Sequence, residues 1–152
     1  MQPLLQNIAQ PDNDGLFGNC VWALSNFCRG KPAPHLSLVA PALPTLVQVL
    51  KSDKPAEVKS DALWALSYIS DGDDDRIQAV LDADPTLASV LMGMLTDDST
   101  LATPALRTVG NIVSGNDDQT QAIVEAGFMD RINVLLHAPK RMLRKEACWV
   151  LR

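Results

Sequence analysis

The stretch that decides the fold is Asp61-Ala62-Leu63-Trp64-Ala65-Leu66-Ser67-Tyr68, because related stretches recur along the chain. The others are centred on Trp22, Arg107 and Trp149, so these residues and Trp64 are spaced 42, 43 and 42 positions apart. We call these four the marker residues. A fixed period of this size predicts a solenoid built from stacked helical repeats.

Composition and charge narrow the class of protein. Hydrophobic residues make up 47% of the 152 positions, which is enough for a substantial core. The net charge of −5 argues against nucleic-acid binding, which needs a basic face, and suits a basic partner. Three cysteines, Cys20, Cys28 and Cys148, lack metal-ligand spacing, so we expect reduced thiols that act as small packing groups. No apolar run reaches the roughly 18 residues that a membrane span needs.

The helix pattern predicts an all-α fold, since no segment alternates with the period of two that a sheet requires. Turn residues divide each period into a short, a medium and a long helix, with long helices expected at roughly 16–29, 55–70, 101–114 and 140–152. Three helices per period favour the armadillo repeat. We divide the chain, 1–152, as one solenoid with a partial repeat at 1–30, repeats at 31–72 and 73–115, and a C-terminally truncated repeat at 116–152.

Each long helix is expected to have a core stripe and a second, polar and aromatic face, because side chains recur every 3.6 residues. The predicted core residues are Leu16, Cys20, Ala23, Leu24 and Phe27, then Val58, Ala62, Ala65, Leu66 and Ile69, then Leu101, Ala105, Val109 and Ile112, and finally Leu143, Ala147, Val150 and Leu151. The second face carries Asn19, Trp22 and Asn26, then Glu57, Asp61, Trp64 and Tyr68, then Arg107 and Asn111, and finally Glu146 and Trp149.

This second face predicts a ladder of binding residues rather than tryptophans that only fill gaps. An Asn side chain can donate to and accept from an extended peptide backbone at the same time. Neighbouring indole rings can hold the aliphatic stem and cationic head of Lys or Arg. Carboxylates at the rim, such as Asp61 and Glu146, would add charge complementarity. The expected ligand is therefore an extended, basic peptide.

Several blocks of the sequence resemble importin-α (karyopherin-α), the adaptor that recognises nuclear localisation signals. In order along essentially the whole chain, they are WALSNFCRGK at 22–31, ALPTL at 42–46, WALSYISDG at 64–72, TPALRTVGNIV at 103–113 and KEACW at 145–149. The resemblance implies a right-handed superhelix of armadillo repeats, of which this chain covers roughly the fourth to the seventh. It also implies a non-enzymatic import adaptor without a cofactor, present in cytoplasm and nucleus, whose partners are cargo proteins.

The resemblance assigns peptide-binding roles to two groups of residues. The group on the side of the family's major signal-binding site contains Trp22, Asn26, Asp61, Trp64 and Tyr68. The group on the side of the minor site contains Arg107, Asn111, Val113, Ser114, Gly115, Thr120, Glu146 and Trp149. There Val113 and Gly115 would offer backbone carbonyls, and Thr120 a hydroxyl, to a lysine of the signal.

The chain also departs from the family. We expect a fragment, a truncated gene product or a degenerate paralogue, without the Arg/Lys-rich segment through which full-length members bind importin-β. Two alternatives stay open: an armadillo scaffold for another protein partner, and a truncated product with little binding of its own.

Other motifs carry less information about function. Asp71, Asp73 and Asp75 are spaced like the start of a calcium loop, but Arg76 stands where that loop needs glycine, so acidic capping of the next helix is favoured. His35 and His137 are isolated and belong to no catalytic set, so we expect neither an enzyme nor a metal site.

Overall fold

Helices follow one another along the whole of the computed structural model, which describes residues 1–152. The elements are α1 (Gln2–Ala9), α2 (Asp14–Cys28), α3 (Leu36–Val39), the short 3₁₀ helix η1 (Ala40–Ala42), α4 (Leu43–Lys51), α5 (Ala56–Ile69), α6 (Asp74–Asp82), α7 (Leu87–Met94), α8 (Ser99–Ile112), α9 (Asp117–Glu125), α10 (Phe128–Leu136) and α11 (Arg141–Val150). The prediction of an all-α solenoid is confirmed. None of the helices combines the length and apolar character that crossing a bilayer would require.

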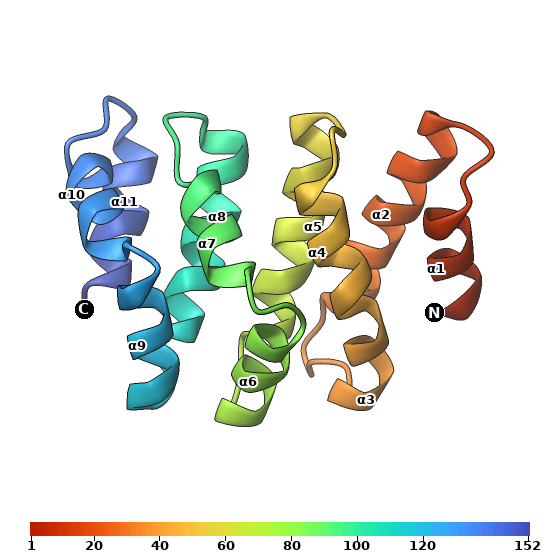
Figure 1. Cartoon of the computed structure of the whole chain (residues 1–152), viewed down its shortest axis with the longest axis horizontal. Helices are drawn as coiled ribbons and strands as arrows, with labels where there is room; N and C mark the ends of the chain where they lie inside the picture. The colour runs from red at the N-terminus through yellow and green to blue at the C-terminus, as the bar shows by residue number, and fades with distance from the viewer.

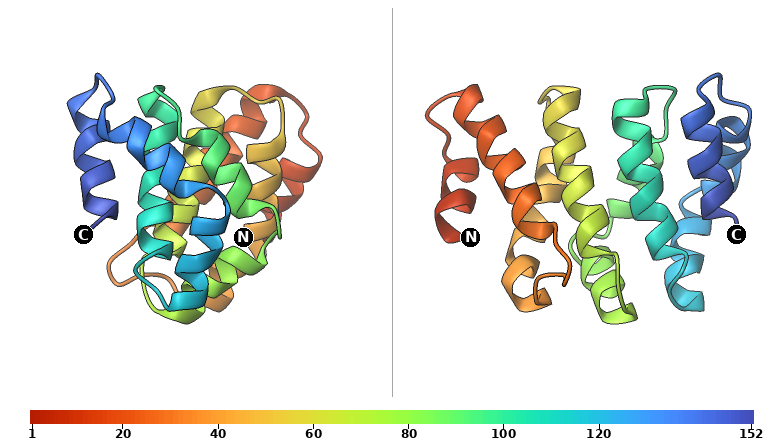
Figure 2. Two further views of the ribbon diagram at one scale, coloured as in Figure 1. Left: turned by 60° about the vertical axis from the view of Figure 1, so that its left-hand side comes forward. Right: turned by 180° about the vertical axis from the view of Figure 1, so that it is seen from behind.

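The short, medium and long helices recur as three-helix units: α3 to α5 (with η1), α6 to α8, and α9 to α11. A two-helix unit, α1 and α2, precedes them, and the units stack side by side from the N-terminus to the C-terminus (Figure 1). The long helices α2, α5, α8 and α11 form one face of the stack (Figure 2, right), while α4, α7 and α10 lie on the other. Because α5 packs on both α2 and α8, and α8 on α11, the long helices form a continuous layer.

Local sequence explains where helices begin. The side chain of Asp73 accepts a hydrogen bond from the backbone N–H of Arg76 at 3.1 Å and caps α6, which confirms capping as the role of the acidic turn. Asn116 and Gln119 form a reciprocal capping box at the start of α9. Gln119 also donates to the carbonyl of Asp74 at 2.9 Å, so this cap joins α9 to the preceding unit.

The long helices α2, α5 and α8, each of which packs on the next long helix, share one fully buried position. Val21, Leu63 and Leu106 share the spacing of the marker residues, and none is exposed to solvent. The equivalent residue of α11, Cys148, is exposed, so the prediction that its thiol acts as a packing group is wrong. Cys20 and Cys28 are buried as predicted.

Two predicted core residues are largely exposed. Phe27, at 60% exposure, lies in the unit that has only two helices, whereas its equivalents Ile69 and Ile112 in three-helix units are fully buried. Leu151, at 49% exposure, follows the end of α11. The 3.6-residue periodicity of a single helix could not predict either exposure, because a core side chain is shielded from solvent by residues of other helices.

Side chains of one unit also bind the backbone of the unit before it. In α8, Asn111 Nδ2 donates to the carbonyl of Ser67 at 2.8 Å, and Thr108 Oγ1 to the carbonyl of Leu63 at 3.4 Å. These carbonyls belong to α5, so the bonds align the two long helices along their length.

Arg76 performs a similar role at the C-terminal end of α5. Its side chain is nearly buried, and Nε donates to the carbonyl of Ile69 at 2.9 Å while Nη1 donates to the carbonyl of Pro34 at 3.0 Å. A residue at the start of α6 therefore binds both the end of α5 and the loop before α3. Hydrogen bonds from a charged donor contribute more than neutral ones.

We expect Leu63→Ala to lower the free energy of unfolding by about 2–5 kcal/mol, because it opens a cavity between α5 and α8. Chemical denaturation followed by circular dichroism measures the loss. Leu38→Ala is the matched control, since Leu38 is 63% exposed, and should change stability by less than about 0.5 kcal/mol. Equal effects of the two substitutions would contradict the stacked arrangement.

Candidate peptide-binding site

The marker residues lie one on each long helix. Trp22 is on α2 and is 59% exposed, and the half-buried Trp64 and Trp149 are on α5 and α11. Arg107, on α8, is exposed. Because the long helices lie side by side (Figure 2, right), the markers are distributed along one face of the solenoid.

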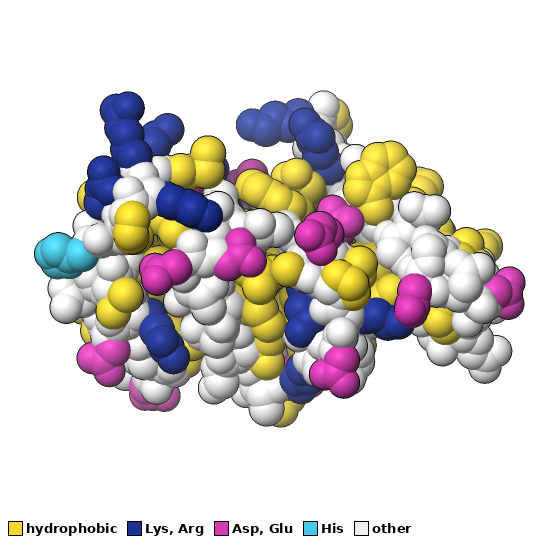
Figure 3. Space-filling view, turned by 90° about the horizontal axis from the view of Figure 1, so that it is seen from above, with side chains coloured by type: hydrophobic (Ala, Val, Ile, Leu, Met, Phe, Trp, Pro, Cys, Tyr) yellow, Lys and Arg dark blue, Asp and Glu magenta, His cyan; other side chains and the backbone are white.

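The N-terminal part of this face contains a pocket of about 450 Å³ between α2 and α5. Its lining residues are Gly18, Asn19, Trp22, Glu57, Val58 and Asp61. We call it the α2–α5 pocket. It combines the exposed indole of Trp22 with the carboxylates of Glu57 and Asp61. Neither carboxylate takes part in any of the three ion pairs of the structure. Figure 3 shows acidic and hydrophobic side chains next to one another over these helices.

The carboxylate of Asp61 is half-buried, and desolvation by this burial raises its pKa above the ordinary value. Burial disfavours the charged form of a carboxyl group unless a cation lies nearby. The pocket therefore contains a charge that the protein itself leaves uncompensated, which a bound cation would stabilise.

Two further predicted residues form an aromatic pair in the middle of the face. The rings of Trp64 and Tyr68 stack with centroids 6.0 Å apart and planes inclined by 24°. Such pairing holds the indole in place. On α2, the exposed Asn26 donates from Nδ2 to the carbonyl of Trp22 at 3.0 Å, a bond within its own helix.

The C-terminal part of the face has a different charge arrangement. Arg107 forms a two-point ion pair with Glu146, with Nε 2.5 Å from Oε2 and Nη2 3.0 Å from Oε1. Glu146 is only 6% exposed, so the prediction of a carboxylate at the rim is wrong. The neighbouring helix supplies the cation that neutralises it. The guanidinium of Arg107 also lies over the ring of Trp149, 5.3 Å from its centroid.

A pocket of about 220 Å³ lies between the ends of α8 and α11. Its lining residues are Asp71, Gly110, Asn111, Val113, Ser114, Trp149, Val150 and Arg152. We call it the α8–α11 pocket. It brings together four predicted residues, Asn111, Val113, Ser114 and Trp149.

Two other predicted residues, Gly115 and Thr120, lie outside this lining. The hydroxyl of Thr120 donates to the carbonyl of Val113 at 3.3 Å, so it is already engaged within the protein. Gly115 is in close contact with the side chain of Gln119, which a Cβ at position 115 would meet at 2.0 Å.

The side-chain amide of Asn111 also forms hydrogen bonds within the protein. Its Nδ2 donates to the carbonyl of Ser67 and to Ser70 Oγ, at 2.8 and 3.2 Å. In this arrangement only its Oδ1 is left for a ligand, and Oδ1 can accept but not donate. The predicted double role of Asn111 is therefore reduced to that of an acceptor.

Four lining residues of the α8–α11 pocket were not predicted as site residues: Asp71, Gly110, Arg152 and Val150, of which Val150 was predicted for the core. A signal for Gly110 existed, because glycine inside a helix costs about 1 kcal/mol relative to alanine and so suggests a packing reason. That reason is Trp149, whose Cζ3 would lie 2.0 Å from a Cβ at position 110. The indole lies directly on the bare backbone of α8.

The acidic residues of the chain lie almost entirely before α10. Residues 128–152 contain six Lys and Arg against two Asp and Glu, whereas residues 1–127 contain seven against sixteen. Basic side chains gather over the end of the stack that holds α10 and α11 (Figure 3, upper left). The face that carries the marker residues, for which an acidic character was predicted, is thus acidic between α2 and α5, and not around α11.

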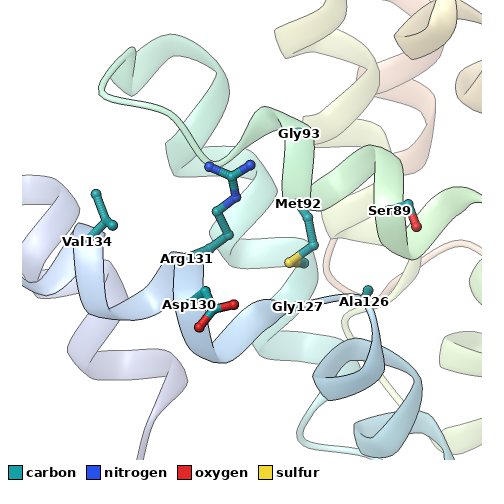
Figure 4. A pocket seen from close by; sticks show the side chains of 8 residues that line it. All are labelled: Ser89, Met92, Gly93, Ala126, Gly127, Asp130, Arg131 and Val134. Carbon is teal, nitrogen blue, oxygen red and sulfur yellow. The ribbon is translucent and has the colours of Figure 1, made fainter.

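The opposite face has a pocket of about 550 Å³ between α7 and α10. Asp130 and Arg131 rise from α10 and point in different directions, and Met92 points into the space between the helices (Figure 4). None of the predicted site residues lines it. No group of three or more His, Cys, Asp and Glu side chains is placed to hold a metal ion.

Comparisons with known proteins agree with this architecture. A sequence model of the HEAT-like repeat matches residues 19–69, and one of the armadillo/β-catenin-like repeat matches residues 116–152. A designed armadillo repeat protein in complex with the peptide (KR)4 superposes with a TM-score of 0.86 at 30% identity, covering 98% of this chain and 62% of that one.

Similarity to natural proteins decides the family. Importin subunit alpha-1b of rice (Oryza sativa subsp. japonica) is 43% identical over 152 residues, which are 98% of this chain and 28% of the rice protein. Importin subunit alpha-4 of Arabidopsis thaliana is 45% identical over 154 residues, which are 99% of this chain and 28% of that protein. The chain is an armadillo-repeat homologue of importin-α. This importin-α homologue spans little more than a quarter of the length of these two relatives.

In this importin-α homologue, we expect Gly110→Ala to push the indole of Trp149 off α8. Overpacking of this kind lowers the free energy of unfolding by about 1–3 kcal/mol. The emission of Trp149, measured with Trp22 and Trp64 replaced by Phe, should shift to longer wavelength as the ring becomes more exposed.

Gly93→Ala is the matched control, because a Cβ at Gly93 meets no atom within 4 Å. It should leave the emission unchanged and stabilise α7 by up to about 1 kcal/mol. If Gly110→Ala were equally stabilising, the contact between Trp149 and α8 would be refuted.

Proposed function

We propose that this chain binds extended Lys/Arg-rich peptides along the face of its long helices and acts as a receptor for nuclear localisation signals in protein import into the nucleus. The observation that carries the proposal is the α2–α5 pocket, where the exposed indole of Trp22 lies beside the unpaired carboxylates of Glu57 and Asp61.

The chemistry of this pocket suits a Lys or Arg side chain. The aliphatic stem of either residue can cover the indole, and the cationic head is attracted to the ring face. A cation placed against Asp61 would also compensate the half-buried carboxylate, whose pKa is raised by desolvation. An anionic side chain would gain none of these interactions.

The relatives support the same ligand class. Over nearly the whole of this chain, stretches of proteins named importin subunit alpha are more than 40% identical to it. The designed armadillo protein of similar fold is in complex with a peptide of alternating Lys and Arg. On this proposal the partners are basic signals of cargo proteins, the protein works in cytoplasm and nucleus, and importin-β is a partner of the full-length relatives.

We expect a Lys/Arg-rich octapeptide to bind this chain more tightly than the same peptide with alanine at its basic positions. Replacing Trp22 by alanine should weaken binding of the basic peptide about 2- to 30-fold, since a cation–π contact contributes roughly 0.5–2 kcal/mol. Isothermal titration calorimetry or fluorescence anisotropy measures both effects.

Phe27→Ala is the matched control, because Phe27 is also an aromatic residue of α2, is equally exposed, and lies outside the pocket. Trp64→Ala and Asn111→Ala are secondary variants, since both residues also make contacts within the protein. Equal binding of the two peptides, or equal effects of Trp22→Ala and Phe27→Ala, would refute the proposal and favour a scaffold for another partner or a chain with little binding.

Asp61→Asn should separate stability from binding. Because burial raises the pKa of Asp61, the ionised carboxylate opposes folding at neutral pH, and the substitution should increase the free energy of unfolding there. The increase should shrink as the pH falls through the raised pKa and vanish below the ordinary Asp value of about 3.9. The same variant should bind the basic peptide more weakly.

The measurements are denaturation at several pH values and peptide titration at pH 7. Asp53→Asn serves as the control, because Asp53 is an exposed carboxylate outside the pocket. A destabilised Asp61→Asn protein that bound peptide as tightly as the wild type would show that Asp61 is structural.

A further inference from the structure

Small residues recur in the first three long helices, and the sequence position with the same spacing in the last unit, 152, is an arginine that follows the end of α11. Ser25, Ser67, Gly110 and Arg152 have the spacing of the marker residues, 42, 43 and 42 positions apart. Ser25 and Ser67 each donate from Oγ to the carbonyl three residues earlier, at 2.8 Å, so their side chains stay close to the helix. In the last unit a long cation stands at the position of these small residues.

The guanidinium of Arg152 lies over the ring of Trp149, with Cζ 5.1 Å from the ring centroid. This distance falls within the range of a cation–π contact. Arg152 also lines the α8–α11 pocket together with Trp149, Asn111 and Asp71. It forms none of the three ion pairs, in contrast to Arg107, which Glu146 neutralises.

We infer that Arg152 is an internal competitor for the α8–α11 pocket. Its guanidinium takes the place on Trp149 that a Lys or Arg of a bound peptide would occupy. This inference rests on the proposed function and adds a specificity to it: the chain recognises basic residues through the α2–α5 pocket, while the α8–α11 pocket is closed to them by the chain's own cation.

The two pockets differ in charge as this inference requires. The α2–α5 pocket has two carboxylates and no basic residue in its lining. The α8–α11 pocket has one carboxylate, Asp71, and already contains Arg152. A ligand cation entering there must displace the guanidinium or share the ring with a like charge, and like charges at close range repel.

The experiment compares Arg152→Ser with Arg141→Ser. Both remove one positive charge from the C-terminal segment, but Arg141 is exposed and does not line the pocket. Trp22 and Trp64 are replaced by Phe so that Trp149 is the only tryptophan. A Lys/Arg-rich octapeptide is then titrated into each variant. Circular dichroism confirms that each variant is folded.

Arg152→Ser should tighten peptide binding at Trp149 about two- to fivefold relative to Arg141→Ser, which is the loss expected for one competing cation–π contact. Without peptide, Arg152→Ser should change the emission of Trp149 and Arg141→Ser should not. Equal peptide affinities of the two variants, or a Trp149 emission that does not change in Arg152→Ser, would overturn the inference.

A parallel titration follows Trp22, with Trp64 and Trp149 replaced by Phe. If the basic peptide perturbs Trp22 in this chain, the proposed function stands whatever the result at Trp149. If it does not, the proposed function fails, and the peptide-free emission of Trp149 still decides whether Arg152 occupies the indole.

Discussion

The burial of each long helix against the next is the constraint on which the rest of the structure depends. A single unit cannot cover its own apolar surface. Val21, Leu63 and Leu106 are excluded from solvent in a layer where each long helix packs on the next. Hydrogen bonds from Asn111 and Thr108 to carbonyls of α5 then fix how far one helix can slide along the other. Together these contacts place the marker residues on one face.

The face that results is not uniform, and the reason is chemical. In the α2–α5 pocket, Glu57 and Asp61 form no ion pair within the protein, so their carboxylates are available to a ligand. Around α11 the protein supplies its own cations: Arg107 pairs with Glu146, and Arg152 stacks on Trp149. Similar side chains at equivalent positions can therefore have different functions, because the neighbouring helix changes their charge environment.

The sequence predicted the features that repeat and missed those that depend on a single neighbour. The period follows from the recurrence of the marker residues, and the helix order and the capping by Asp73 follow from patterns within one unit; all are present in the structure. The burial of Glu146 could not be predicted from its own helix, because Arg107 comes from a helix 39 residues earlier. The exposure of Phe27 was missed for the same reason. The peptide-binding roles of the predicted residues stay predictions, although the structure gathers several of them in two pockets.

Arg76 has a consequence for how the chain loses its structure. One side chain at the start of α6 is bonded to the end of α5 and to the loop before α3, so it belongs to two units at once. If either unit opened alone, a nearly buried guanidinium would lose a hydrogen-bond partner, and this cost would be added to the free energy of opening. Such shared residues couple neighbouring repeats, and the coupling favours cooperative melting over the independent fraying of single repeats.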